Sequence, residues 1–587
     1  MSSKRQRREP VRHSQERVAA EATLLIEPFG VLLILLVLSV GLLAHGLVPL
    51  TDYILWDGWW CAADLARPEG PTVMTRIFHE VGRPIDMWFY APIRWLGGNS
   101  VAWAKWLSTA AWIGTAVCVA AVLRRAAGLP YAVATAMAVL VVALPIFDLL
   151  GELALWMYTA CVLLFWLAWV LVSRLPELVG WRAIAVRLTA LCLFFISFNL
   201  NSNLVMFYAV AAALAGLRLP DMRPQTLVNR LPREVIRHAD FLALPIGFWL
   251  WKTLFTPTSG FYATGYNQPS LAPDRLAAGY SGLVFDFVLR GLIDLLSSFT
   301  WIAASVVVAI VATVVMRRFP LPEVVVEHSA RLGLRLLGWG LFLLLAAAFP
   351  YIVVGQSLAS EGWLTRNCIL CPLPVAMITC GLLIVVNRWW LSQYPKAWLA
   401  GVAAIATLGV GGCIHNYLAY QALGAKQWSI RSRLMEMIYD SDAAVVQLRD
   451  YYRIPRTIPY YPPVIWTYLA SGTGALPKTF VIETAMLAPD GVDQGPDGQP
   501  RRVIPAIPLR SEGLDEAIVG TTMPYALEQV PRTGPQIMVT IEPGSENAEP
   551  SDLGLRYLVL SWLAPDRLPD FLRGLINAES RSLPPIQ

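Results

Sequence analysis

The chain has 587 residues, of which 56% are hydrophobic and 15% are charged. A soluble globular protein carries about a quarter charged residues, so lipid rather than water must surround much of this chain. The formal net charge of +5 does not indicate nucleic-acid binding, because the Lys and Arg residues lie mostly in short clusters between apolar segments. The composition therefore predicts an α-helical polytopic membrane protein.

The first 29 residues are strongly basic and precede a long apolar segment. No small-residue cleavage site is evident, so we expect a cytoplasmic N-terminus followed by an uncleaved helix. A bilayer core of about 30 Å needs about 20 apolar residues per helix, and this window predicts about eleven spans. They lie near residues 30–49, 101–123, 129–147, 153–173, 186–200, 203–217, 239–256, 293–316, 334–355, 369–386 and 398–419.

Lys and Arg are enriched in the cytoplasmic loops of membrane proteins, so their positions test the predicted spans. Basic clusters follow alternate spans, at 124–125, 174–187, 218–237, 317–318 and 388–396. An even number of spans separates each cluster from the N-terminus, which predicts a cytoplasmic N-terminus and an extracytoplasmic C-terminus. The longer predicted loops on the outer side are then 50–100, 257–290 and 356–367.

We predict three parts along the chain: the N-terminus (1–29), a transmembrane domain (30–422) and a C-terminal extracytoplasmic domain (423–587). The last part is richer in Pro, Gly and acidic residues than the rest. It combines strand-like and helix-like segments, near 479–482, 536–541, 425–450 and 566–579, and we expect a small mixed α/β domain. Frequent Ala, Leu, Arg, Trp and Pro are typical of a GC-rich bacterial genome, which favours a bacterial inner membrane with this domain in the periplasm.

The loop 50–100 sets carboxylates among tryptophans, with Asp57 between Trp56 and the pair Trp59–Trp60. Aromatic faces beside carboxylates suit sugars, and a carboxylate can take the proton of an acceptor hydroxyl. An aromatic belt at the membrane surface, with solvated acids beside it, explains the same residues equally well.

With Asp57 after the first span and Gly82-Arg83-Pro84 later in the same loop, the chain resembles the GT-C superfamily of membrane glycosyltransferases, and within it the O-antigen glucosyltransferase type. The late loop that carries Arg366 is also similar to a loop of these enzymes. The resemblance covers the membrane region in outline. Gly58 stands where the family often has the second Asp of a pair, and the segment from 423 onwards is not covered.

The resemblance implies a polyprenyl-phosphate-linked sugar as donor and a lipid-linked or cell-surface glycan as acceptor, joined on the extracytoplasmic face. Asp57 would act as general base in an inverting transfer. A divalent metal ion, Mg²⁺ or Mn²⁺, is compatible with this chemistry but not required by it. The donor phosphate needs a cation, and arginine binds two phosphate oxygens at once, so Arg83 and Arg366 are the candidates. Snorkelling at helix ends is the competing explanation for both arginines.

Other residues with polar side chains are candidates for substrate binding, namely His79, Glu80, Asp86, Glu152 and Tyr266. Glu152 follows the third predicted span, and acids at a membrane boundary are often functional. Ordinary solvated loop residues, or packing in the case of Tyr266, explain the same pattern.

Three other functions stay open. A polysaccharide polymerase or ligase with a lipid-diphosphate donor would share the many spans and outer arginines. A glycan transporter or flippase would be expected to show repeats and ionisable residues near mid-membrane, and the sequence shows neither. A non-catalytic scaffold would bind cell-wall components through the C-terminal part.

Overall fold

The computed structural model of the protein describes most of the membrane region and parts of the C-terminal region. The described residues are 28–55, 58, 61–62, 65, 70–97, 99–218, 232, 235–259, 269–297, 299–318, 329–391, 393–394, 396–439, 445–450, 452, 481–485, 492–494, 500–502, 509–510, 534–546 and 548–586.

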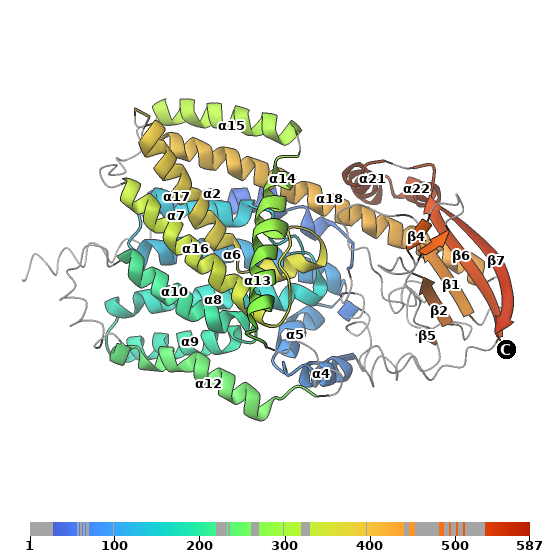
Figure 1. Ribbon diagram of the computed structural model, residues 1–587, viewed down its shortest axis with the longest axis horizontal. Coiled ribbons are helices and arrows are strands. Elements are labelled where there is room, and N and C mark those ends of the chain that lie inside the picture. The colour runs from blue at the N-terminus through green and yellow to red at the C-terminus, as the bar shows by residue number, and fades with distance from the viewer. Residues whose placement is uncertain are drawn as a thin grey trace, which may run out of the picture.

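Apolar helices form a bundle with their axes roughly along one direction (Figure 1). Most of their residues are apolar, as expected where a helix faces other helices and lipid rather than water. The helices of the bundle are α2 (Pro28–His45), α6 (Ser100–Arg125), α7 (Tyr131–Ala143), α8 (Trp156–Arg174), α9 (Gly180–Ser197), α10 (Ser202–Arg218), α12 (Ala239–Phe255), α15 (Phe299–Arg318), α16 (Ser329–Val353), α17 (Pro372–Trp390) and α18 (Ala397–Tyr439).

Among the described residues, eight helices are long and apolar enough to cross a membrane. All of them except Pro273–Leu295 coincide with predicted spans, and three shorter apolar helices, at 131–143, 202–218 and 300–314, coincide with others. The prediction of a helical, multi-pass membrane protein is therefore confirmed. A lipid bilayer is the environment that these helices require.

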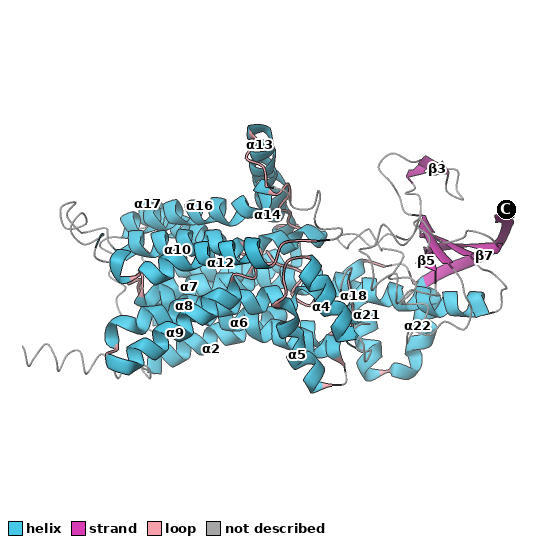
Figure 2. Ribbon diagram, turned by 90° about the horizontal axis from the view of Figure 1, so that it is seen from below, coloured by secondary structure: helices cyan, strands magenta, loops and turns pink. Residues whose placement is uncertain are grey.

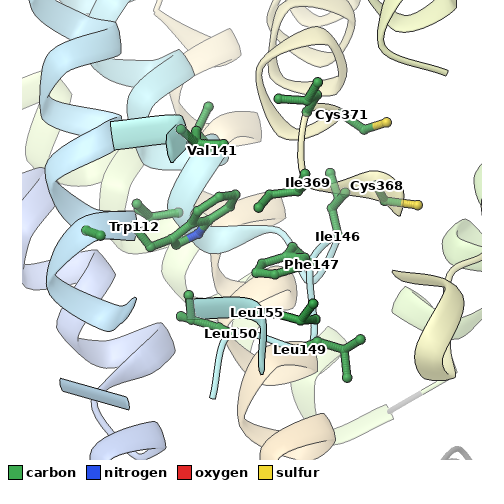
Figure 3. Packing of buried hydrophobic residues seen from close by; sticks show 14 of the residues in the cluster. Trp112, Val141, Ile146, Phe147, Leu149, Leu150, Leu155, Cys368, Ile369 and Cys371 are labelled. Carbon is green, nitrogen blue, oxygen red and sulfur yellow. The ribbon is translucent and has the colours of Figure 1, made fainter. Parts of the chain in front are cut away.

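The short helix α7 lies at the centre of the bundle, and every residue from Val133 to Ala143 is buried. Beyond it the chain continues as a buried, irregular segment, whose Ile146 and Phe147 lie beside Trp112 and beside Ile369 in the turn before α17 (Figure 3). Backbone without regular structure is tolerated at membrane depth where protein surrounds it. This packing explains how a helix of 13 residues can serve as a core element.

The first loop, residues 50–100, contains two short helices, α4 (Gly70–Glu80) and α5 (Asp86–Leu96). It lies at the end of the bundle where α6 and α8 begin and α9 and α12 end. This end faces the C-terminal sheet, and we call it the sheet end (Figures 1 and 2).

The second predicted outer loop, 257–290, contains regular helix from Pro273 onwards. Helix α13 (Pro273–Gly282), a π-helical segment η6 (Leu283–Leu289) and α14 (Arg290–Leu295) form one continuous rod. The rod runs across the direction of the bundle helices in both views (Figures 1 and 2). As a result α15 begins only at Phe299, later than the predicted start at 293.

Helix α18 passes without interruption through the predicted domain boundary at 423. Its 43 residues correspond to about 65 Å at 1.5 Å per residue, about twice the thickness of a bilayer core. The helix therefore extends beyond the sheet end of the bundle toward the C-terminal strands (Figure 1). The expected separate helix near 425–450 is the last part of α18, followed by a strand.

The C-terminal region contains a five-stranded mixed sheet in the order β5-β2-β1-β6-β7. Strand β1 pairs in parallel with β2 and β6, whereas β5 and β7 add antiparallel edges. The strand-like runs near 479–482 and 536–541 fall on or beside β2 and β6. The strands are β1 (Val445–Asp450), β2 (Val481–Ala485), β5 (Leu509–Arg510), β6 (Gly534–Pro543) and β7 (Ile576–Ile586). Strands β3 (Val492–Gln494) and β4 (Pro500–Arg502) pair with each other.

Helix α21 (Pro550–Leu563) packs against α18 through Gly554, while α22 (Leu568–Leu575) leads into β7. A Cβ atom at Gly554 would overlap the backbone carbonyl of Leu418, so only glycine allows the two helices this close an approach. By contrast, a Cβ at Gly338 in α16 would meet no atom within 4 Å.

We expect Gly554→Ala to destabilise the protein by about 1–3 kcal/mol, because overpacking forces the helices apart. The matched control Gly338→Ala should be neutral or stabilising by up to about 1 kcal/mol, since alanine favours helix and has space there. Thermal unfolding midpoints of both variants in the same detergent test this. Equal midpoints would contradict the close packing of α21 on α18.

Candidate functional site

Asp57 itself lies outside the described residues, but Leu55 and Gly58 on either side of it are described. The Leu55 N–H donates to Glu152 Oε2 at 2.8 Å, and the Gly58 N–H donates to the Leu55 carbonyl at 2.8 Å. A Cβ atom at Gly58 would overlap Glu152 Oε1. Gly58 therefore makes room for a carboxylate from a distant part of the chain.

Glu152 is 1% exposed and stands at the start of a short 3₁₀ helix that leads into α8. Its Oε1 accepts from the Ala154 N–H at 3.2 Å, so both carboxylate oxygens receive backbone hydrogen bonds. A buried carboxylate is stable only when it is paired or hydrogen-bonded. Glu152 thus lies close to the chain beside Asp57, although the sequence alone gave no reason to connect it with residue 58.

Lys105, which we did not single out in the sequence, holds the beginning of the first loop. Lys105 lies in α6, and its side chain is fully buried. Its Nζ donates hydrogen bonds to the carbonyls of Thr51 at 3.0 Å and Tyr53 at 2.8 Å. The same Nζ lies 3.9 Å from the centre of the Tyr53 ring, a cation–π contact. A single lysine near the end of an apolar span is a signal that could have identified it.

Asp52 links the loop to two other helices. Its Oδ1 accepts from Gln421 Nε2 of α18 at 2.7 Å, and its Oδ2 accepts from the Tyr557 hydroxyl of α21 at 2.7 Å. Gln427, also in α18, donates to the carbonyl of Ile54 at 3.1 Å. The C-terminal region is therefore in direct contact with the segment that precedes Asp57.

Arg83 forms an ion pair with the buried Asp86, with Arg83 Nε 3.1 Å from Asp86 Oδ2. Arg83 Nη1 donates to the Tyr158 hydroxyl at 3.1 Å, and its guanidinium lies over the Tyr158 ring. Asn199, in the turn between α9 and α10, donates to Asp86 Oδ1. Asp86 begins α5, where a negative charge is favoured by the helix dipole.

A second cation, Lys252 of α12, adds to this cluster. It acts electrostatically on Asp86 and donates to Asn201 Oδ1 at 2.9 Å. Arg83 Nη2 is buried and has no hydrogen-bond partner among the described residues. Two cations against one carboxylate, with one buried N–H donor still available, favour an anion as the additional partner.

Gly82 in the Gly-Arg-Pro segment has φ +70°, in the left-handed region that favours glycine. A Cβ there would also lie 2.8 Å from the Thr256 carbonyl, just after α12. The Ser259 N–H donates to the Glu80 carbonyl at 2.9 Å in the same contact. Gly82 therefore allows the first loop to pack against the end of α12, which brings Arg83 to Lys252.

Tyr90 connects the contacts around Glu152 with those around Arg83 and Asp86. It lies in the second turn of α5, after Asp86, and its hydroxyl is 3.3 Å from the Leu153 carbonyl and 3.2 Å from the Ala154 carbonyl. The Trp156 indole N–H donates to the Phe89 carbonyl at 2.7 Å. Helix α5 is thus fixed to the chain that follows Glu152, and both groups of contacts lie at the sheet end.

The remaining predicted site residues are less closely joined to these contacts. His79 is exposed, and its Nδ1 lies 2.7 Å from the Thr75 carbonyl one turn earlier in α4. Glu80 is half-buried beside Gly82. The Arg366 guanidinium stacks on Trp363 of its own loop, 4.8 Å from the ring centre. Tyr266 lies outside the described residues.

No group of three His, Cys, Asp or Glu side chains that could hold a metal ion occurs among the described residues. Asp57 is not among them, so the expectation about Mg²⁺ or Mn²⁺ stays a prediction.

We expect Gly58→Ala to destabilise the protein by about 1–3 kcal/mol, because the new methyl group overlaps the Glu152 carboxylate. In a Glu152→Ala background the same substitution should cost much less, since the space is vacated. In the matched Glu152→Gln background, which keeps the bulk, it should stay costly. Unfolding midpoints of the single and double variants measure this coupling. An equal cost of Gly58→Ala in all three backgrounds would contradict the contact.

Burial raises the pKa of Asp86 to about 6, and the charges of Arg83 and Lys252 act against this shift. Between about pH 6 and pH 4 the folded protein therefore binds a proton at Asp86 that the unfolded chain does not yet bind. The contribution of Asp86 to the free energy of unfolding therefore increases as the pH falls, by about 2 kcal/mol between pH 7 and pH 4.5.

This pH dependence is measured as the difference in unfolding midpoint between wild type and Asp86→Asn at the two pH values. The unfolding midpoint of wild type relative to that of the variant should be higher at the lower pH, because asparagine does not titrate. A difference that is the same at both values would contradict the raised pKa.

Comparison of the chain with protein-family models, with curated proteins and with solved structures gives no match. The residues and contacts described above are therefore the basis for a functional proposal.

Proposed function

We propose that the protein is a GT-C-like membrane glycosyltransferase. It transfers a sugar, with inversion, from a polyprenyl-phosphate donor to a lipid-linked or cell-surface glycan on the extracytoplasmic face. The observation that carries the proposal is the anchoring of the first loop at the sheet end. Buried Glu152 and Lys105 hold the chain beside Asp57, while Arg83 and Lys252 collect positive charge at the same end.

Asp57 serves as the general base. It takes the proton of the acceptor hydroxyl while that oxygen forms a bond to the anomeric carbon of the donor sugar. The bond between the anomeric carbon and the phosphate oxygen breaks on the opposite face, so the configuration inverts and polyprenyl phosphate leaves. General-base catalysis of this kind is worth about 10²–10⁴ in rate.

The leaving phosphate gains negative charge as the bond breaks, and a cation stabilises that charge. Arg83 is the best candidate, because its buried Nη2 has no hydrogen-bond partner among the described residues and Lys252 adds a second positive charge. Asp86 and Tyr158 hold the guanidinium in place. Arg366, stacked on Trp363, is the second candidate.

The remaining substrate contacts follow the same proposal. His79, Glu80 and Tyr266 are candidates for acceptor or sugar hydroxyls, while Glu152 and Asp86 position the loop and the arginine. A divalent metal ion would be held by Asp57 with other oxygen ligands, and would supply charge stabilisation at the phosphate.

The test is transfer of labelled sugar from a panel of polyprenyl-phosphate donors by the purified full-length protein. We expect Asp57→Asn to lower transfer by a hundredfold or more, because asparagine cannot accept the proton. Asp64→Asn makes the same chemical change in the same loop and is the matched control, with activity expected near wild type. Size-exclusion profiles check that both variants are folded.

Unchanged transfer by Asp57→Asn would exclude Asp57 as the base. If wild type transfers sugar from no monophosphate donor, the proposal fails. Activity with a lipid-diphosphate donor would then favour a polymerase or ligase, and movement of lipid-linked glycan without transfer would favour a transporter.

A further inference from the structure

The rod formed by α13, η6 and α14, residues 273–295, has two faces of different character. Leu283 and Phe287 are buried against the rest of the protein, and a Cβ at Gly279 would overlap the side chain of Ile352 in α16. The Tyr280 hydroxyl lies 3.5 Å from the carbonyl of Leu345, also in α16. One face of the rod thus packs on α16.

Charged residues fix the last part of the rod to the loop 356–367. Arg290 forms an ion pair with Glu361, and Ser360 donates through its hydroxyl to Asp294 Oδ2 at 3.4 Å. The Ser360 N–H also donates to the Asp286 carbonyl at 3.2 Å. Residues 286, 290 and 294 recur every four positions, so they follow one side of the rod.

The opposite side is apolar and exposed. Its large hydrophobic residues recur in pairs every four positions, at Val284, Phe285, Val288, Leu289, Leu292, Ile293 and Leu296, and each is between 41% and 68% exposed. No charged residue interrupts this stripe. Such a continuous apolar surface on a single helix is stable only in an apolar environment.

The direction of the rod shows which environment this is. It runs across the bundle helices at the sheet end, between the end of α12 and the start of α15 (Figures 1 and 2). Its length and hydropathy would allow it to cross a membrane, but the spans beside it run at a steep angle to it. A membrane that holds the bundle therefore has the rod lying along its surface.

We propose that residues 273–295 form an amphipathic helix that lies in the plane of the membrane at the sheet end. The apolar stripe rests among lipid acyl chains, and the charged side clamps the loop 356–367. Amphipathic helices with one apolar and one polar face bind membrane surfaces in this way. The charge pattern of the chain agrees, because a crossing at 273–295 would move Arg317 and Arg318 to the outer side.

The test places nitroxide spin labels on single cysteines in the full-length protein in lipid nanodiscs. The labels stand at Phe285, Leu289 and Ile293 on the stripe, with Leu341, an exposed residue midway along α16, as a control for a label inside a span. Cys192 is replaced by serine because it is the exposed native cysteine, whereas the others are buried or partly buried. Collision rates with oxygen and with a water-soluble nickel complex report depth.

We expect all three stripe labels to favour oxygen and to lie at similar, shallow depths, less deep than the Leu341 label. If the rod crossed the membrane, residues 285 and 293 would differ in depth by about 12 Å, at 1.5 Å per residue. Such a gradient would overturn the proposal. Labels that favour the nickel complex, or that are shielded from both reagents, would also overturn it, since water or a second protein copy would then cover the stripe.

Discussion

The structure depends on hydrogen bonds between the backbone of the first loop and two buried charged side chains of the bundle region. Lys105 is fully buried in a span, and its ammonium group donates hydrogen bonds to the carbonyls of Thr51 and Tyr53. Glu152 is buried against the loop, and its carboxylate accepts a hydrogen bond from the Leu55 N–H. A buried polar group without a partner costs about 1–3 kcal/mol, and more when it is charged. Each buried side chain therefore relies on the loop backbone for its hydrogen bonds, and the loop backbone relies on the side chains.

The C-terminal region makes hydrogen bonds to the same loop. Helix α18 runs from the bundle to the first strand and contributes Gln421 and Gln427, which bind the loop at Asp52 and Ile54. Tyr557 of α21 binds the other oxygen of Asp52. These contacts hold the segment that precedes Asp57. The C-terminal region can therefore position the loop without contributing a residue to the chemistry.

Hydropathy and the distribution of basic residues were sufficient to predict most of the spans, because lipid imposes a minimum apolar length on each one. The same signals did not predict the helical rod at 273–295, because a helix that is apolar on only one side carries charged residues along the other. Lys105 and Lys252 were missed because isolated cations near span ends are common as snorkelling residues. Only the fold shows that Lys105 points into the protein.

The contact between Gly58 and Glu152 could not be predicted from sequence, since 94 positions separate the two residues. A carboxylate is present beside residue 58, but it comes from the turn before α8, and backbone N–H groups occupy both of its oxygens. Its observed contacts hold the backbone at Leu55 and just before α8. A general base needs a fixed position, because small displacements of the reacting groups lower the rate steeply.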